Sequence, residues 1–137
     1  MCLTIEKGQK FRKTRKDIIV YKHVYLIDNT IYSSYRHCRV GMIDNLPIHL
    51  TLDIEKVTTQ MHKDTLEILL GFHSFINLSD CVHQAEYYDE IVIECVIPKG
   101  SWVTEGIFGI FDESSKSIVS TEIIYNKIVE RYDREDN

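Results

Sequence analysis

Several common features are scarce or missing in this chain of 137 residues, which has only two prolines, six glycines and one tryptophan. No apolar run approaches the roughly 20 residues that a membrane-spanning helix needs. The N-terminus places apolar residues before charged ones, the reverse of a secretory signal. Without an export signal, the four cysteines are expected to be reduced thiols. The sequence therefore predicts a cytoplasmic protein without a membrane segment.

Motifs for metal and nucleotide chemistry are also missing. The sequence has no C-x-x-C pair, no glycine-rich phosphate loop, no G-x-S-x-G and no H-E-x-x-H. The nearest histidine–cysteine combinations, His37 with Cys38 and Cys81 with His83, lack the paired spacing of zinc modules. We therefore expect no metal and no intact catalytic motif.

Positive charge is concentrated near the N-terminus. Residues 7–16 carry six lysines and arginines and no acid, whereas the whole chain has a net charge of −5. Such a basic arm could contact nucleic acid or an acidic partner, or it could be a solvated terminus that folds back onto the acidic body. The acidic remainder argues against general nucleic-acid binding. We expect residues 1–137 to be a single domain, with residues 1–16 as a basic arm that is flexible or folded back.

Strand patterns dominate the rest of the chain. Residues 18–27 are mostly β-branched or aromatic, and residues 91–97 are apolar on both faces, as in interior strands. One short helix is expected at about 79–88, because Asn77 or Ser79 can cap its first turn. Further strands are expected at residues 48–54, 66–70, 106–111 and 117–125. The sequence thus predicts an α+β fold, mostly antiparallel β, with five to seven strands and one helix.

A polar stretch near the end of the first strand is one candidate ligand site. It contains Tyr35, Arg36 and Arg39 together with Ser33, Ser34 and His37. Guanidinium groups bind phosphates and carboxylates in a bidentate manner, so the stretch could hold an anionic ligand. The alternative is a solvated loop.

The segment Gly71 to Phe75 is the second candidate. In a strand, His73 and Phe75 would point to one face, and Phe72 and Ser74 to the other. These four side chains could stack against a base or a nicotinamide and add a polar contact. Alternatively, the histidine is buried and held by a backbone hydrogen bond.

Five pieces of sequence resemble small, mostly uncharacterised proteins of tailed phages and prophages. They are Met-Cys-Leu-Thr at 1–4, Val-Tyr-Lys at 20–22, Gly-Phe-His-Ser-Phe at 71–75, Cys-x-Ile-Pro-Lys-Gly-Ser at 95–101, and Gly106. The resemblance spans nearly the whole chain. It implies a phage accessory protein in the host cytoplasm and little about biochemistry.

A looser resemblance is to the core of ADP-ribosyltransferases. In matching order stand His23 or Lys22, the pocket segment 71–74, the Pro-x-Gly bend within 97–100, and Glu122. The resemblance implies an NAD site and a catalytic role for Glu122, whose carboxylate would stabilise an oxocarbenium-like transition state. The sequence departs from that pattern at residues 21–23, at Phe75 and at residues 120–122.

Three hypotheses follow. The first is a non-enzymatic phage accessory protein, without a cofactor, that blocks a host defence protein or sequesters a nucleotide second messenger, alone or as a homo-oligomer. The second is an NAD-dependent mono-ADP-ribosyltransferase, which requires His23, His73, Ser74 and Glu122 to line one open pocket. The third is a structural module with no ligand.

Overall fold

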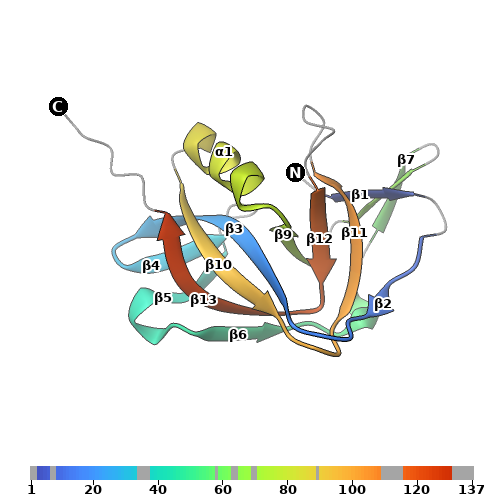
Figure 1. Cartoon of the computed structure of the whole chain (residues 1–137), viewed down its shortest axis with the longest axis horizontal. Helices are drawn as coiled ribbons and strands as arrows, with labels where there is room; N and C mark the ends of the chain where they lie inside the picture. Colours follow the sequence, from blue (N-terminus) through green and yellow to red (C-terminus); the bar gives the residue numbers. More distant parts are fainter. Residues whose placement is uncertain are drawn as a thin grey trace.

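The computed structural model of the chain describes residues 3–6, 9–33, 38–57, 59–62, 65–68, 71–88, 90–108 and 116–130. Within these residues it contains one α-helix and thirteen strands of one sheet (Figure 1). The helix is α1 (Leu78–Tyr88), and the strands are β1 (Leu3–Glu6), β2 (Arg12–Lys13), β3 (Ile18–Ile27), β4 (Thr30–Ser33), β5 (Arg39–Met42), β6 (Ile48–Thr51), β7 (Thr59–His62), β8 (Thr65–Ile68), β9 (Phe72–Phe75), β10 (Ile91–Ile97), β11 (Trp102–Phe108), β12 (Lys116–Ser120) and β13 (Glu122–Glu130). The predicted class, mostly antiparallel β with one helix, is confirmed. The predicted number of five to seven strands was too low, because several strands of two to four residues carry too little pattern to be recognised in the sequence.

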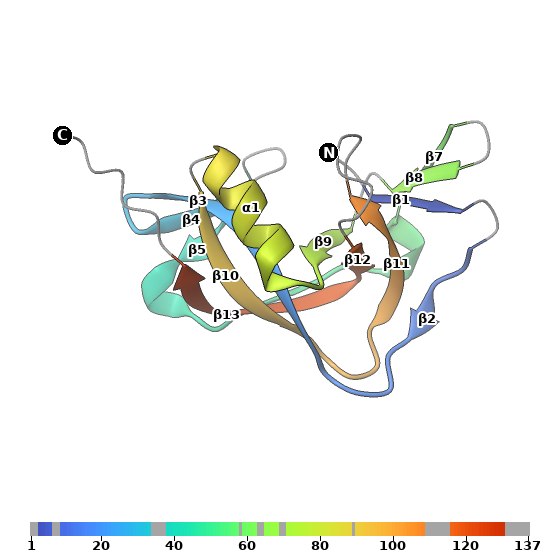
Figure 2. The same ribbon diagram turned by 45° about the horizontal axis from the view of Figure 1, so that its top comes forward.

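The sheet is bent into two halves. Its main path runs β6-β13-β10-β3-β9-β12-β11-β1-β8-β7, and β4 and β5 extend it beside β3. Strands β6, β13, β10 and β3 form one half, and β12, β11, β1, β8 and β7 lie in the other (Figures 1 and 2). The short β9 connects them, because it pairs with β12 along its length and with β3 at one position.

The halves also meet at a corner where one predicted strand becomes two. Residues 117–125 were expected to be continuous, but Thr121 separates β12 from β13. At this corner the Thr121 N–H donates to the Trp102 carbonyl, and the Thr121 hydroxyl accepts from the Trp102 N–H. The Thr121 carbonyl accepts from the N–H of Leu52. These bonds satisfy the backbone groups that the bend removes from the ladder.

The main hydrophobic core lies between the two halves of the sheet. Val20 of β3 and Ile93 of β10 are fully buried there with Ile118 of β12. Cys95 also belongs to this core. Cys38, Cys81 and Cys95 are reduced thiols, of which Cys81 and Cys95 are buried and Cys38 is exposed.

Helix α1 covers the opposite face of β3, β9 and β10 (Figure 2). It begins one residue before the expected start at Ser79 and ends at the expected Tyr88. Its buried residues, Cys81 and Ala85, pack with Phe75 and Val92 in a second apolar cluster. The sheet therefore has an inner face toward the main core and an outer face that α1 covers in part.

The described part of the basic N-terminal segment lies within the sheet. Strand β1 pairs with β8 and β11, and β2 pairs with β11. Arg12 forms an ion pair with Glu105 at 3.5 Å, and the Lys13 ammonium lies 5.2 Å from the centre of the Trp102 ring. Ile5 of β1 is buried, so an apolar side chain packs this strand into the fold.

Candidate functional site

The four residues of β9 point to two different faces, as the strand pattern predicted. Phe72 packs against the main core, and Ser74 is buried on the same inner face. Phe75 belongs to the cluster beneath α1, on the outer face. The two phenylalanine rings are therefore on opposite faces and do not form a single stacking platform.

A backbone hydrogen bond holds His73 in place, as the alternative considered for this histidine expected, but the residue is half-buried and not buried. Its ring is half-buried, and its Nδ1 lies 3.0 Å from the carbonyl oxygen of Gly71. Gly71 itself is required by packing, because a Cβ there would lie 2.5 Å from Cγ1 of Val119. This close approach sets β9 directly against β12.

His23 is a buried residue of the outer face. Its Nδ1 donates to Oε1 of Glu90 at 3.0 Å, and both side chains are almost fully buried. Its ring also contacts Phe75, with centroids 5.6 Å apart. The N–H of Glu90 donates to the carbonyl of Ala85 in α1, so the pair connects the end of the helix to the middle of β3.

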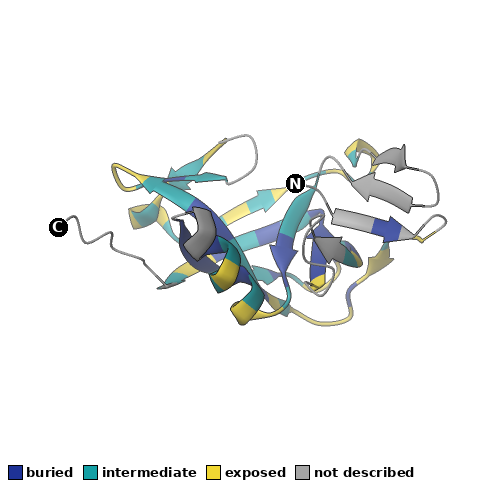
Figure 3. Cartoon of the chain, turned by 90° about the horizontal axis from the view of Figure 1, so that it is seen from above, coloured by how far each residue is buried: buried dark blue, intermediate teal, exposed yellow. Residues whose placement is uncertain are grey.

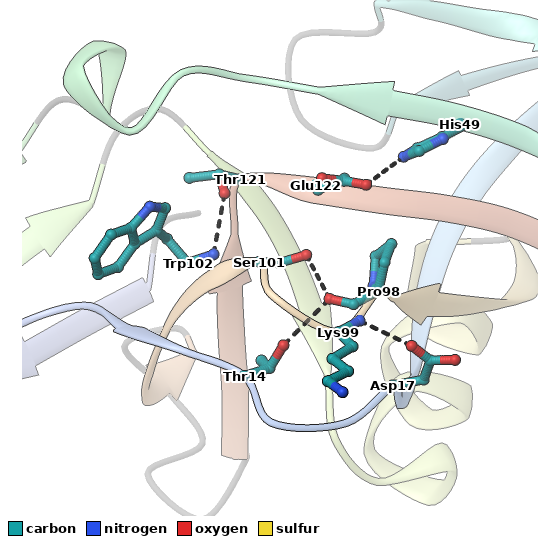
Figure 4. Close-up of polar contacts among 9 residues, drawn as sticks. All are labelled: Thr14, Asp17, His49, Pro98, Lys99, Ser101, Trp102, Thr121 and Glu122. Atoms are coloured by element: carbon teal, nitrogen blue, oxygen red, sulfur yellow. Dashed lines mark hydrogen bonds and ion pairs between the residues drawn. The ribbon is translucent and has the colours of Figure 1, made fainter.

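Glu122 lies on the outer face at the start of β13, opposite in direction to the core residue Ile123. Its Oε2 is 2.6 Å from Nε2 of His49, on the edge strand β6 (Figure 4). The Glu122 side chain is 33% exposed and that of His49 is 51% exposed. Ser74 faces the inner side of the sheet, so Glu122 and Ser74 do not share a surface.

Glu122 is also far from His23 along the sheet. His23 pairs with Val92 of β10, whereas Ile124, two residues after Glu122, pairs with Val96. At about 3.3 Å per residue, Glu122 and His23 are separated by about 20 Å. His23 and Glu122 thus lie at two ends of the outer face, and Ser74 lies on the inner face. These residues do not line the one open pocket that the ADP-ribosyltransferase hypothesis required.

The Pro98-Lys99-Gly100 bend contacts the N-terminal segment. The N–H of Lys99 donates to Asp17, and the hydroxyls of Thr14 and Ser101 both donate to the Pro98 carbonyl (Figure 4). Gly100 adopts a φ of 90°, which favours glycine. The bend therefore closes the turn between β10 and β11, and its side-chain hydrogen bonds among the described residues are with residues 14–17 and with Ser101.

Only part of the polar stretch predicted as an anion site can be placed. Tyr35 and Arg36 lie outside the described residues. Arg39 is the first residue of β5 and is exposed. Ser33, the last residue of β4, and Cys38, just before β5, are joined by two hydrogen bonds. The Ser33 N–H donates to the Cys38 carbonyl at 2.8 Å, and the Cys38 N–H donates to the Ser33 hydroxyl.

Strands β4 and β5 create a surface that the sequence analysis did not predict. Across the outer face, Tyr25 of β3 pairs with Tyr32 of β4, which pairs with Arg39 of β5. Nearer the hairpin tip, Ile27, Thr30 and Met42 form a second row. We call these six residues the hairpin face. A pattern of aromatic and polar residues at 30–33 was too short to indicate a strand.

The hairpin face is open. Ile27 is 57% exposed and Met42 is 37% exposed, two of the four large apolar side chains exposed in the described part of the chain. Exposed residues mark the tip of the β3–β4 hairpin, at the left of Figure 3. Tyr25 and Tyr32 are half-buried, and helix α1 packs against β3, β9 and β10. Apolar and aromatic side chains therefore remain accessible beside an exposed guanidinium.

Among the described residues, no three histidine, cysteine or acidic side chains gather as metal ligands would. The described helix is also too short to cross a membrane. Neither a family model, nor a curated protein, nor a solved structure is similar enough to the chain to count as a match.

Proposed function

We propose that this chain is a non-enzymatic accessory protein that binds another protein through its hairpin face and blocks it. The observation that carries the proposal is the exposed row of Ile27 and Met42 beside two tyrosines and an arginine. Tyrosine, methionine and arginine are enriched at the centres of protein interfaces. Tyrosine and arginine are also the residues that most often dominate binding energies.

The surface indicates the chemistry of its partner. Arg39 is exposed, and no salt bridge in the described part of the chain involves it. Its planar guanidinium can bind a carboxylate through two parallel hydrogen bonds. We therefore expect the partner to present apolar side chains around an aspartate or glutamate.

The resemblance to phage proteins supports a partner from a bacterial host, and a host defence protein is the candidate we favour. A small protein that covers a functional surface needs no catalytic group of its own. The hairpin face is available for such a contact, because β4 and β5 extend the sheet beside β3 and helix α1 packs against β3, β9 and β10.

The geometry gives less support to an ADP-ribosyltransferase-like fold with an NAD site. His23 and Ser74 are buried on opposite faces, and Glu122 is about 20 Å from His23 along the sheet. Incubation with labelled NAD tests this alternative directly. Transfer of label that Glu122→Gln abolishes would restore the enzyme hypothesis.

The interface is tested by comparing two charge reversals. Immobilised wild-type protein, Arg39→Glu and Arg15→Glu are exposed to the same host extract, and any protein retained by the wild type is then purified for affinity measurements. Arg15 is exposed in the N-terminal segment, so its reversal changes net charge equally. We expect Arg39→Glu to weaken binding at least tenfold, as for a desolvated charge pair, and Arg15→Glu to leave it unchanged.

A second variant separates apolar packing from charge. Tyr32→Ala should also weaken binding about tenfold or more if the tyrosine row is an energetic centre. Equal binding by wild type, Arg39→Glu and Tyr32→Ala would refute the hairpin face as the interface. A wild-type dimer that Arg39→Glu dissociates in sedimentation would show that the occupant is a second copy of this chain.

A further inference from the structure

A lysine interrupts the apolar inner face of β3. Its neighbours on that face are Ile18, Val20, Val24 and Leu26, which all belong to or pack against the main core. Lys22 is half-buried among them. Its ammonium donates to the carbonyl of His73 and lies 6.0 Å from the centre of the Tyr125 ring.

This ammonium has no acidic partner in the described part of the chain. No carboxylate there lies within 4.0 Å of Lys22. Burial lowers the pKa of Lys22, and the thiols of Cys95 and Cys81 oppose that shift only in their ionised form. A partly desolvated cation without an anion is costly, so the position calls for an explanation beyond packing.

Two serine hydroxyls on the same face also lack partners. Ser74 is 3% exposed and Ser120 is fully buried, and neither hydroxyl forms a hydrogen bond with any described residue. Burying a hydroxyl without a hydrogen-bond partner is unfavourable in folded proteins. Both hydroxyls therefore remain available to donate to an acceptor on this face.

The register brings the lysine and one serine side by side. Tyr21 of β3 pairs with Phe75 of β9, and these strands are antiparallel. Lys22 and Ser74, the next residues, therefore occupy facing positions on the inner side. Neighbouring strands lie about 4.8 Å apart, which agrees with the bond from Lys22 to the adjacent carbonyl of β9.

The second serine is diagonal to the first. Ser74 pairs with Ile118 of β12, and Ser120 is two residues further along that strand, on the same face. Diagonal positions of this kind lie about 7–8 Å apart. Phe72, which pairs with Ser120, is half-buried on this face and adds an aromatic surface.

We propose that Lys22, Ser74 and Ser120 form a binding site for a small organic anion, on the inner face where β3, β9 and β12 run side by side. The oxygens of a phosphate or carboxylate accept hydrogen bonds from the ammonium and both hydroxyls. The uncharged part of the ligand packs against Phe72 and the surrounding aliphatic side chains. This site is independent of the hairpin face, which uses the opposite side of the sheet.

The ligand probes separate the possible sources of the anion. Inorganic phosphate and acetate test the anionic group alone. Adenosine monophosphate and benzoate add a planar ring that could contact Phe72, and adenosine supplies a ring without charge. Binding is measured by calorimetry, and side-chain NMR follows the titration of Lys22, whose resonance is identified by its loss in Lys22→Met.

Three variants distinguish binding from structure. Lys22→Met keeps the length and apolar stem of the side chain, Ser74→Ala removes one hydroxyl, and Lys99→Met removes an exposed lysine as the control. We expect Lys22→Met and Ser74→Ala to weaken anion binding about 10- to 100-fold, as for hydrogen bonds to a charged group. Lys99→Met should bind like the wild type.

The folding behaviour gives a second readout. Lys22→Met should unfold at the same temperature as the wild type or higher, because an uncompensated charge becomes apolar. Bound anion should raise the pKa of Lys22 in the wild type. The proposal is overturned if no probe moves the Lys22 resonance, if Lys22→Met binds as well as the wild type, or if Lys22→Met lowers the unfolding temperature.

Discussion

Two histidine–glutamate pairs in the same sheet differ in almost everything except their chemistry. His23 and Glu90 are 3.0 Å apart with 6% and 0% of their side chains exposed. His49 and Glu122 are closer, at 2.6 Å, but 51% and 33% exposed. The shorter contact is the one that water screens. Exposed ion pairs contribute little to stability. Breaking a buried pair leaves one polar group buried with neither a partner nor solvent.

The pairs also differ in what they connect. His23 and Glu90 join β3 to the residue between α1 and β10, and the same Glu90 caps the helix through its backbone N–H. His49 and Glu122 join β6 to β13, two strands that four register pairs already hold together. The buried pair therefore fixes the position of the helix, and the exposed pair only adds to an existing ladder.

The largest predicted effect comes from breaking the buried pair. His23→Ala or Glu90→Leu removes one partner and leaves the other buried among Phe75, Val92 and α1. We expect the free energy of unfolding to fall by about 3–5 kcal/mol, measured by urea denaturation at neutral pH. The paired replacement His23→Leu with Glu90→Leu should recover much of this loss. A change below about 1 kcal/mol in both single variants would contradict the role given to burial.

The length of each strand explains which parts of the fold could be predicted from the sequence. Strands β3 and β10 match the expected residues 18–27 and 91–97, because long β-branched runs carry their own signal. Strands β1, β2, β4 and β7 have two to four residues each and were missed. Such short strands form because they pair with the edge of a neighbouring strand. That pairing depends on the tertiary structure and cannot be recognised in the local sequence.

The candidate site was predictable only in part for a related reason. Alternation along β9 correctly separated Phe72 and Ser74 from His73, but the sequence could not say that both faces are covered. Lys22 was considered only through a family resemblance, although it interrupts an apolar series. Its importance depends on Ser74 and Ser120, which approach it only when β9 and β12 are placed beside β3.

Alkaline pH should lower the stability of the folded chain through its buried ionisable groups. Burial raises the pKa of Cys95 from 9.0 to about 12, and it raises the pKa values of Cys81 and Tyr125 as well. The folded chain keeps these protons while the unfolded chain loses them, so stability falls as the pH rises above about 9. Lys22 acts in the opposite direction, because its lowered pKa makes stability rise with pH up to its usual 10.5.

Thermal unfolding between pH 8 and pH 11 measures this balance. We expect the unfolding temperature of the wild type to fall above pH 9. The raised pKa values of Cys95, Cys81 and Tyr125 lower stability there, and the lowered pKa of Lys22 offsets only part of that loss. Cys95→Ala should make the decline shallower, and Lys22→Met should make it steeper because the compensating group is gone. The titratable groups that face Lys22 are Cys95, Cys81 and Tyr125, and its ammonium also contacts the backbone carbonyl of His73. A stability that stays level to pH 11 in all three proteins would contradict the assigned pKa shifts.

The smallest effect is expected from the exposed pair. His49→Ala and Glu122→Gln should each change the free energy of unfolding by less than about 1 kcal/mol, and a double-mutant cycle should give a coupling of about 0.2–1 kcal/mol. Raising the salt concentration to 1 M should reduce that coupling, because it shortens the screening length to about 3 Å, while the coupling of His23 with Glu90 should persist. A coupling above 2 kcal/mol, or a loss of partner binding in Glu122→Gln, would mean that this edge of the sheet is organised for function, because geometry alone gives an exposed pair no such strength.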